Sequence, residues 1–178
     1  MSKNNKGLSD ALNAARDGDL QKIKKFIAAQ KDLNVQGPDG RTILINAAAN
    51  HHGEIVELLV NAGADVNCVT NSKKTVLNYT LCRAFGFNIG GKRGDSRVLD
   101  IVKLLLKHNC TISSFDIASA ILFQSPEVLS ALLKRVSQNK NILNDAIDYV
   151  DRNAFEYDVK ESTFKKNLNT VRDCLKRI

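Results

Sequence analysis

The sequence predicts an all-α solenoid, in which helix-turn-helix pairs repeat along the chain and are connected by short hairpin loops. One observation is a 33-residue period, which relates Asn34 to Asn67, Thr42 to Thr75 and Leu44 to Leu77. A second is that two helical patterns of apolar residues, separated by a short polar link, lie between the two asparagines. A third is the composition: 43% of the 178 residues are hydrophobic, yet no apolar run approaches the ~20 residues that cross a bilayer.

The period is clearest in residues 37–69, which we interpret as the second unit of the array. The inner helix of this unit is marked by Leu44, Ala47 and Ala48, and the outer helix by Ile55, Val56, Leu58 and Leu59. Gly63 stands where a left-handed residue would end the outer helix. Residues 8–36 repeat the pattern as a first unit, and we expect residues 1–7 to form a disordered tail.

Three further units follow, with decreasing regularity. Residues 70–113 form a third unit, but Asn67 and its equivalent Ser113 are 46 residues apart instead of 33. This unit therefore carries an insertion of about 13 residues between its two helices, which we place at 84–97. A degenerate fourth unit is predicted over residues 114–139, and a fifth, which would cap the array, over residues 140–178.

These residues closely resemble the ankyrin repeat family. The shared positions are Gly40, Thr42, Leu44, Ala47, Ala48, His52, Ile55, Val56, Leu58, Leu59 and the unbroken "GADVN" of Gly63–Asn67. The sequence departs from the family pattern at Ile43, which replaces a proline, at Ile45, which replaces a histidine, and at His51, which replaces a glycine. The resemblance is strong over residues 8–82 and 98–113 and weaker beyond.

The resemblance implies a non-catalytic scaffold or adaptor that binds a partner protein. In this family the partner usually contacts the hairpin tips and the exposed residues of the inner helices. Carried onto this chain, the tip residues are Asp39, Arg41, Lys73 and Lys74, and the inner-helix residues are Asn46, Asn50, Asn78 and Arg83. The hairpins after the third unit are short, so the binding face is expected over residues 38–97.

The insertion contains "GFNIGGKR", which nearly matches the phosphate-binding pattern G-x-x-x-x-G-K-[ST]. The final hydroxyl residue is replaced by Arg93, and the segment before it resembles a helix, whereas a phosphate-binding loop follows a strand. Two interpretations remain: a flexible glycine-rich linker, or a binding loop on a rigid scaffold. In the second, the contacts come from Phe85, Phe87, Ile89, Lys92, Arg93 and Arg97.

Catalytic, cofactor and metal sites are not expected. The four cysteines lie far apart, without the paired spacing of a zinc site, so we interpret them as small buried apolar residues. His51 and His52 lie at a turn between helices, and no carboxylate pair or Cys–His pattern accompanies them. Neither a nucleophile with a positioned base nor a ligand cluster emerges from the sequence, so we do not predict an enzyme.

The charge suggests the nature of the partner. A formal net charge of +7 favours a protein partner with an acidic surface, and it leaves a basic nucleic-acid-binding module as the alternative. Few aromatic residues are present to stack on bases, which disfavours that alternative. We expect a monomer in the cytoplasm, with no membrane segment, or in a host cytoplasm if the protein is a secreted effector of an intracellular bacterium. The resemblance also suggests hydroxylation of Asn67.

Overall fold

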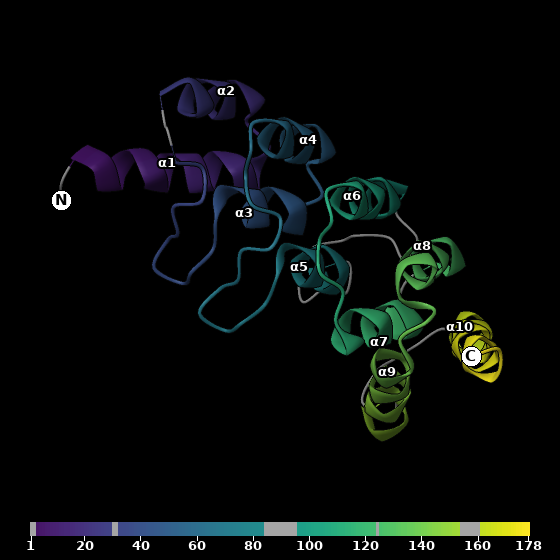
Figure 1. The fold of residues 1–178 in the computed structure, drawn as a ribbon. Coiled ribbons are helices and arrows are strands. Elements are labelled where there is room, and N and C mark those ends of the chain that lie inside the picture. Colours follow the sequence, from purple (N-terminus) through teal and green to yellow (C-terminus); the bar gives the residue numbers. More distant parts are fainter. Residues whose placement is uncertain (1–2, 30–31, 84–95, 124, 154–160) are drawn as a thin grey trace.

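The computed structural model describes residues 3–29, 32–83, 96–123, 125–153 and 161–178 (Figure 1). Ten helices form in these residues and alternate between two layers. The inner layer contains α1 (Lys3–Asp17), α3 (Ile43–Ala49), α5 (Val76–Arg83), α7 (Ser114–Phe123) and α9 (Lys140–Asn153). The outer layer contains α2 (Leu20–Ala29), α4 (Gly53–Asn61), α6 (Ser96–Lys107), α8 (Pro126–Val136) and α10 (Glu161–Lys176).

Each helix packs against its pair and against the next helix of its own layer, as Figure 1 shows. The apolar core lies between the layers and continues through successive pairs, with Ile45, Leu59, Leu77, Ile101 and Ile117 among its fully buried side chains. The predicted all-α solenoid of helix pairs is therefore confirmed. The residue boundaries of the individual repeats stay a prediction.

The amino-terminal segment differs from expectation. Residues 1–7 were expected to be a disordered tail, but α1 begins at Lys3 and continues without a break into the first repeat. A helix can extend through this segment because it contains no proline, and its single glycine, Gly7, costs only about 1 kcal/mol relative to alanine. Leu8, one residue further on, packs half-buried against the core and anchors that turn.

The inner helices α3 and α5 each begin at a threonine that caps the first turn. Thr42 accepts a hydrogen bond at Oγ1 from the Ile45 amide, at 3.2 Å, so α3 begins where expected although Ile43 replaces the family's proline. At α5, Asn78 and Thr75 cap one another: the Thr75 amide donates to Asn78 Oδ1, at 3.0 Å, and the Asn78 amide donates to Thr75 Oγ1, at 3.2 Å. Such reciprocal caps satisfy amides that a helix start leaves unpaired.

Two adjacent histidines connect the second helix pair to both of its neighbours. His52 donates from Nε2 to the Arg16 carbonyl at the end of α1, at 2.9 Å, and His51 donates to the Thr80 carbonyl of α5, at 3.2 Å. His51 is buried and adopts a left-handed conformation with φ of 58°, where the family pattern has a glycine. The two rings thus point in opposite directions along the array and support the structural interpretation of this pair.

Gly18, in the turn between α1 and α2, lies directly beneath the His52 ring. A Cβ atom at Gly18 would lie 2.7 Å from His52 Cε1, and the residue has φ of +82°. Gly63 has a similar φ of +94°, but a Cβ atom there would meet no atom within 4 Å. Substituting Gly63 therefore measures the energetic cost of a left-handed non-glycine residue alone. Substituting Gly18 measures that cost together with the cost of displacing the His52 ring.

We predict that Gly63→Ala lowers the free energy of unfolding by about 1–2 kcal/mol, the usual cost of a left-handed non-glycine residue. Gly18→Ala should cost more, because the new methyl group also displaces His52. In a His52→Ala background the cost of Gly18→Ala should fall to that of Gly63→Ala. Urea unfolding followed by circular dichroism measures the wild type and the four variants, and an equal cost of Gly18→Ala in both backgrounds would contradict this account.

Candidate partner-binding surface

Two hairpins extend from the inner layer next to α3 and α5, and we call them the first finger (residues 36–41) and the second finger (residues 69–75) (Figure 1). The first finger closes with a 2.8 Å hydrogen bond from the Gly37 amide to the Arg41 carbonyl. The second is closed by an antiparallel bridge between Val69 and Thr75 and by a 3.0 Å bond from the Thr70 amide to the Lys74 carbonyl.

The two fingers are joined by hydrogen bonds along their length. Gln36 donates from Nε2 to the Val69 carbonyl at 2.8 Å, and Asn71 donates from Nδ2 to the Pro38 carbonyl at 3.0 Å. The Asn71 amide also donates to the Asp39 carbonyl, at 3.3 Å. Gly40, with φ of +80°, allows this approach, because a Cβ atom there would lie 2.4 Å from the Asn71 nitrogen. The two fingers therefore form a single ridge.

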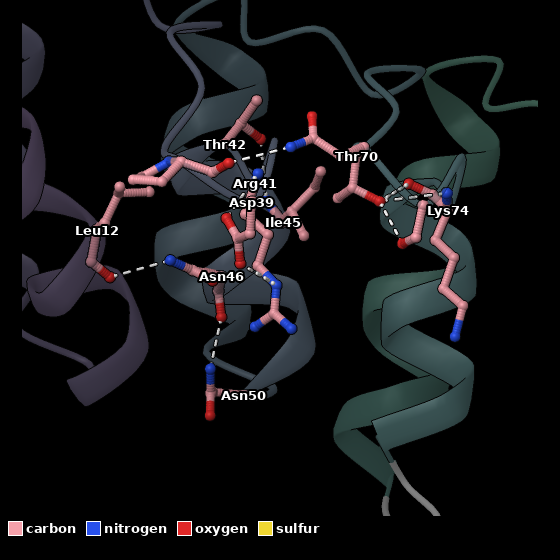
Figure 2. Close-up of polar contacts among 12 residues, drawn as sticks. Leu12, Asp39, Arg41, Thr42, Ile45, Asn46, Asn50, Thr70 and Lys74 are labelled. Atoms are coloured by element: carbon pink, nitrogen blue, oxygen red, sulfur yellow. Dashed lines mark hydrogen bonds and ion pairs between the residues drawn. The ribbon is translucent and has the colours of Figure 1, made fainter.

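Arg41 ties the first finger to the inner helix of the next repeat. Its Nε lies 3.1 Å from Asp39 Oδ2, and its guanidinium carbon lies 4.7 Å from the centroid of the Tyr79 ring on α5. Figure 2 shows Asp39 and Arg41 side by side above α3. Burial alone would raise the pKa of Tyr79, but hydrogen bonds with Ser72 and Thr70 and the Arg41 charge outweigh it and lower that pKa. The ring thus supports both fingers from below.

The inner-helix asparagines are engaged within the protein. Asn46 donates from Nδ2 to the Leu12 carbonyl of α1, at 3.2 Å, and Asn50 donates to the Asn46 carbonyl, at 2.7 Å (Figure 2). Both side chains are half-buried, so each has a structural role beside any contact with a partner.

Asn78, which was predicted to contact a partner, is buried, with only 6% of its surface exposed. Its amide caps α5 and also donates to Asp116 Oδ1 at the start of α7. Because the family's histidine position is filled by Asn78 in one repeat and by Asp116 in the next, the two side chains meet inside the array. The prediction of Asn78 as a surface contact is corrected accordingly.

The remaining predicted contacts lie at or within the insertion. Arg83 is the last residue of α5, and Arg97 is an exposed residue in the first turn of α6. Phe85, Phe87, Ile89, Lys92 and Arg93 lie outside the described residues, as does the side chain of Arg83. The insertion therefore joins the end of α5 that is remote from the second finger. The eight residues of α5 place about 12 Å between these two ends.

The hairpin after α6 keeps the base of a finger but lacks its tip. Asn67 Oδ1 accepts from the Thr111 amide at 2.8 Å, just as Asn34 Oδ1 accepts from the Asp65 amide at 2.8 Å one repeat earlier. Only two residues then separate Thr111 from the first residue of α7, Ser114. Asn67 thus has a structural role in the hairpin, and its hydroxylation stays a prediction.

Because the hairpin after α6 does not extend into a third finger, a groove is left beside the second finger. It lies between the second finger and α7, has a volume of about 340 Å³, and is lined by Lys73, Lys74, Thr75, Asn78, Thr111, Ile112, Ser113, Phe115 and Asp116. The short spacing in the sequence predicts a short hairpin but does not predict the groove. Tyr79 was not predicted either, since its only signal is an aromatic residue one helical turn after Thr75.

Across the residues that the structure describes, no group of three His, Cys, Asp or Glu residues could hold a metal ion. Burial raises the pKa of Cys68 and of Cys110 to about 11, and it also raises the pKa of Cys82, so these thiols are poor nucleophiles at neutral pH. Among the described helices, none is long and apolar enough to cross a membrane.

We predict that Gly40→Ala separates the two fingers. The added methyl group would displace Asn71 and break the hydrogen bond from its backbone amide to the Asp39 carbonyl. Because such a hydrogen bond contributes about 1 kcal/mol, exchange of the Asn71 amide hydrogen with solvent should become about fivefold faster or more. Gly63→Ala is the control, since it places the same methyl group at a left-handed glycine with open space around it. Hydrogen exchange measured by NMR tests this. Equal Asn71 exchange rates in the two variants would show that Gly40 does not set the finger contact.

Comparison with known proteins places this geometry in a family. The family model for ankyrin repeats, in three copies, matches residues 11–116. A putative ankyrin repeat protein of Rickettsia bellii is 35% identical over 159 residues, which are 87% of this chain and 20% of that protein. The ankyrin repeat and KH domain-containing protein mask-1 of Caenorhabditis elegans is 46% identical over 61 residues, which cover 34% of this chain and 2% of that protein.

The putative ankyrin repeat protein YahD of Escherichia coli is 36% identical over 59 residues, which cover 33% of this chain and 29% of that protein. The chain thus spans less than a third of the length of each of these relatives. The matched repeats include both fingers, the histidine turn and the α5–α7 caps. The helix pairs and the fingers agree with the family match, and this chain belongs to the ankyrin repeat family.

Proposed function

We propose that this protein is a non-catalytic adaptor that binds a partner protein across its two fingers and the adjoining inner helices. Ankyrin repeats generally mediate protein–protein interaction, which supports the general class. The observation that carries the proposal for this chain is the finger ridge, because bonds between the fingers and the Arg41–Tyr79 contact hold its side chains in place before any partner arrives. A surface ordered in advance loses less conformational entropy on binding.

An acidic partner surface fits the charge of this ridge. The fingers carry three cations, Arg41, Lys73 and Lys74, and one carboxylate, Asp39, which is already paired with Arg41. Lys73 and Lys74 are exposed near the tip of the second finger. Complementary charge mainly accelerates encounter and selects the partner, while packed groups supply most of the affinity.

The insertion at 84–97 is proposed as the second contact of the same partner. Its attachment points support this, since Arg83 lies at the far end of α5 from Lys74. A partner that covered α5 along its length of about 12 Å would meet the finger at one end and the insertion at the other. In this proposal Phe85, Phe87 and Ile89 supply apolar contacts, and Lys92, Arg93 and Arg97 supply charge.

We further propose that the protein acts as a monomer in the cytoplasm, or in a host cytoplasm as a secreted effector. The similarity to a bacterial ankyrin protein supports the second setting. A translocation reporter fused to the chain, assayed in infected cells, distinguishes the two settings. An enzymatic activity is not part of the proposal.

Direct nucleic-acid binding is the second candidate, and the net charge of +7 favours it. Several basic side chains outside the fingers are already opposed by carboxylates, however. Lys22 pairs with Asp19 at 2.9 Å, and Arg172 lies 3.5 Å from Asp151. Such pairs weaken the positive field that would attract phosphates.

We predict that Lys73→Glu/Lys74→Glu lowers capture of partner proteins from a eukaryotic cell lysate by about tenfold or more, because it reverses the charge of the ridge. Replacing residues 84–97 by a short turn should lower capture as well. The matched control is Lys103→Glu/Lys107→Glu, which changes the same charge on the outer helix α6. Mass spectrometry of nuclease-treated, salt-washed captures gives the readout.

Two results would contradict the proposal. One is recovery of the same proteins, in equal amounts, with the wild type, the finger variant and the control. The other is recovery of nothing except nucleic acid in captures made without nuclease, lost steeply as salt is raised, which would establish the alternative.

A further inference from the structure

The groove beside the second finger exists because the array changes there. The side of the second finger that faces α7 has no third finger against it, since only two residues separate Thr111 from the start of α7 at Ser114. The opposite side of the same finger is covered by Gln36 and Pro38 of the first. The groove thus occupies the place where a regular array would have placed its next hairpin.

The walls of the groove combine apolar surface with positive charge. Phe115 and Ile112 are half-buried and form the apolar wall. The Phe115 ring packs edge-to-face on Tyr149 of α9, with centroids 5.6 Å apart, which fixes its position. Lys73 and Lys74 stand exposed on the finger side, and among the described residues no carboxylate forms an ion pair with either.

The floor of the groove contains one carboxylate, but its charge is shielded. Asp116 is 1% exposed, and its Oδ2 accepts from the Ser113 amide at 2.8 Å and the Ser113 hydroxyl at 2.7 Å. Its Oδ1 accepts from the Asn78 amide group. Burial raises the pKa of this carboxyl, although the hydrogen bonds oppose the shift. The accessible charge of the groove therefore comes from the two lysines.

We infer that this groove binds a short extended segment of a partner protein in which acidic side chains alternate with large apolar ones. The acidic side chains would pair with Lys73 and Lys74, and the apolar ones would pack on Phe115 and Ile112. A groove of about 340 Å³ accommodates only a few side chains, at the small end of the usual size of ligand sites. This inference rests on the proposed function as a protein-binding adaptor, and it adds a recognition motif and a place.

The probe for the test is an acetylated hexapeptide of alternating glutamate and leucine, with the lysine–leucine hexapeptide as its control. We expect the acidic peptide to shift the NMR signals of Lys74, Thr111 and Phe115, and the basic peptide to leave them unchanged. Binding should weaken as salt is raised, because the lysines are exposed and their charge is screened.

Thr111 offers a matched pair of variants. It is exposed on the groove wall, and both variants keep its backbone amide, which donates to Asn67 Oδ1 at 2.8 Å. Both lose the hydrogen bond from the Thr111 hydroxyl to the same oxygen, at 3.2 Å, so this loss cancels in the comparison. Thr111→Glu places a competing carboxylate beside the lysines, so peptide affinity should fall about tenfold, as expected for the loss of two exposed charge contacts. Thr111→Gln fills the same volume without charge and should change affinity less than about threefold.

Three results would overturn the inference: no binding of the acidic peptide, signals that shift on α1 or α3 instead of the groove, or equal losses in the two Thr111 variants. The proposed adaptor function is tested separately by protein capture with Thr111→Glu. One result would be that Thr111→Glu captures the same partner proteins as the wild type while Lys73→Glu/Lys74→Glu loses them. That result would contradict the groove inference and leave the proposed finger contact supported.

Discussion

The whole structure depends on the fact that a single helix pair in this chain cannot bury its own apolar surface. Ala47 and Ala48 of α3 are completely buried, and the inner helices α1 and α5 pack against α3 from both sides, so the pair depends on its neighbours for burial. Apolar contact alone does not fix how the pairs are placed relative to one another. Directional hydrogen bonds supply that information, and His51 and His52 do so in both directions from a single turn.

The same need for register shapes the surface that we propose for partner binding. Asn34 and Asn67 connect successive hairpins at their bases, whereas Gln36 connects the two fingers where they begin and Asn71 connects them near their tips. Past the second finger the base contact persists and the tip contact ends. The surface formed by the fingers and the inner helices is therefore divided into the finger ridge and the groove in front of α7. The side chains of the finger ridge are held in place by contacts within the protein. The groove presents an apolar wall and two lysine charges.

Much of the fold could be predicted from the sequence, because the signals involved are local and repeat. The 33-residue period, the cap residue Thr42 and the glycine at Gly63 each determine the backbone near their own position, and α3 and α4 lie where these residues place them. The start of α1 was mispredicted because a polar composition resembles disorder even where nothing interrupts the helix.

The site was harder to predict, because its features depend on pairs of distant residues. Asn78 is on the correct helix, but it is buried because Asp116 lies 38 positions later and accepts its hydrogen bond. Tyr79 becomes part of the ridge only because Arg41 of the previous repeat lies over its ring. The groove arises because the hairpin after α6 lacks its tip, and a linear sequence pattern records this only as a shorter spacing. Each of these required knowing how the repeats stack.

The contact between Asn67 and Thr111 has an evolutionary consequence. It joins residues 44 positions apart, while the equivalent contact between Asn34 and Asp65 joins residues 31 positions apart, yet the two bonds have the same length. The insertion between α5 and α6 thus leaves the contact at the base of the following hairpin unchanged. Because each doubling of a loop costs only about 0.6 kcal/mol in closure entropy, this turn can lengthen and diversify at little cost to stability. It is a natural position for a lineage to acquire new specificity, and for an engineer to graft a foreign peptide.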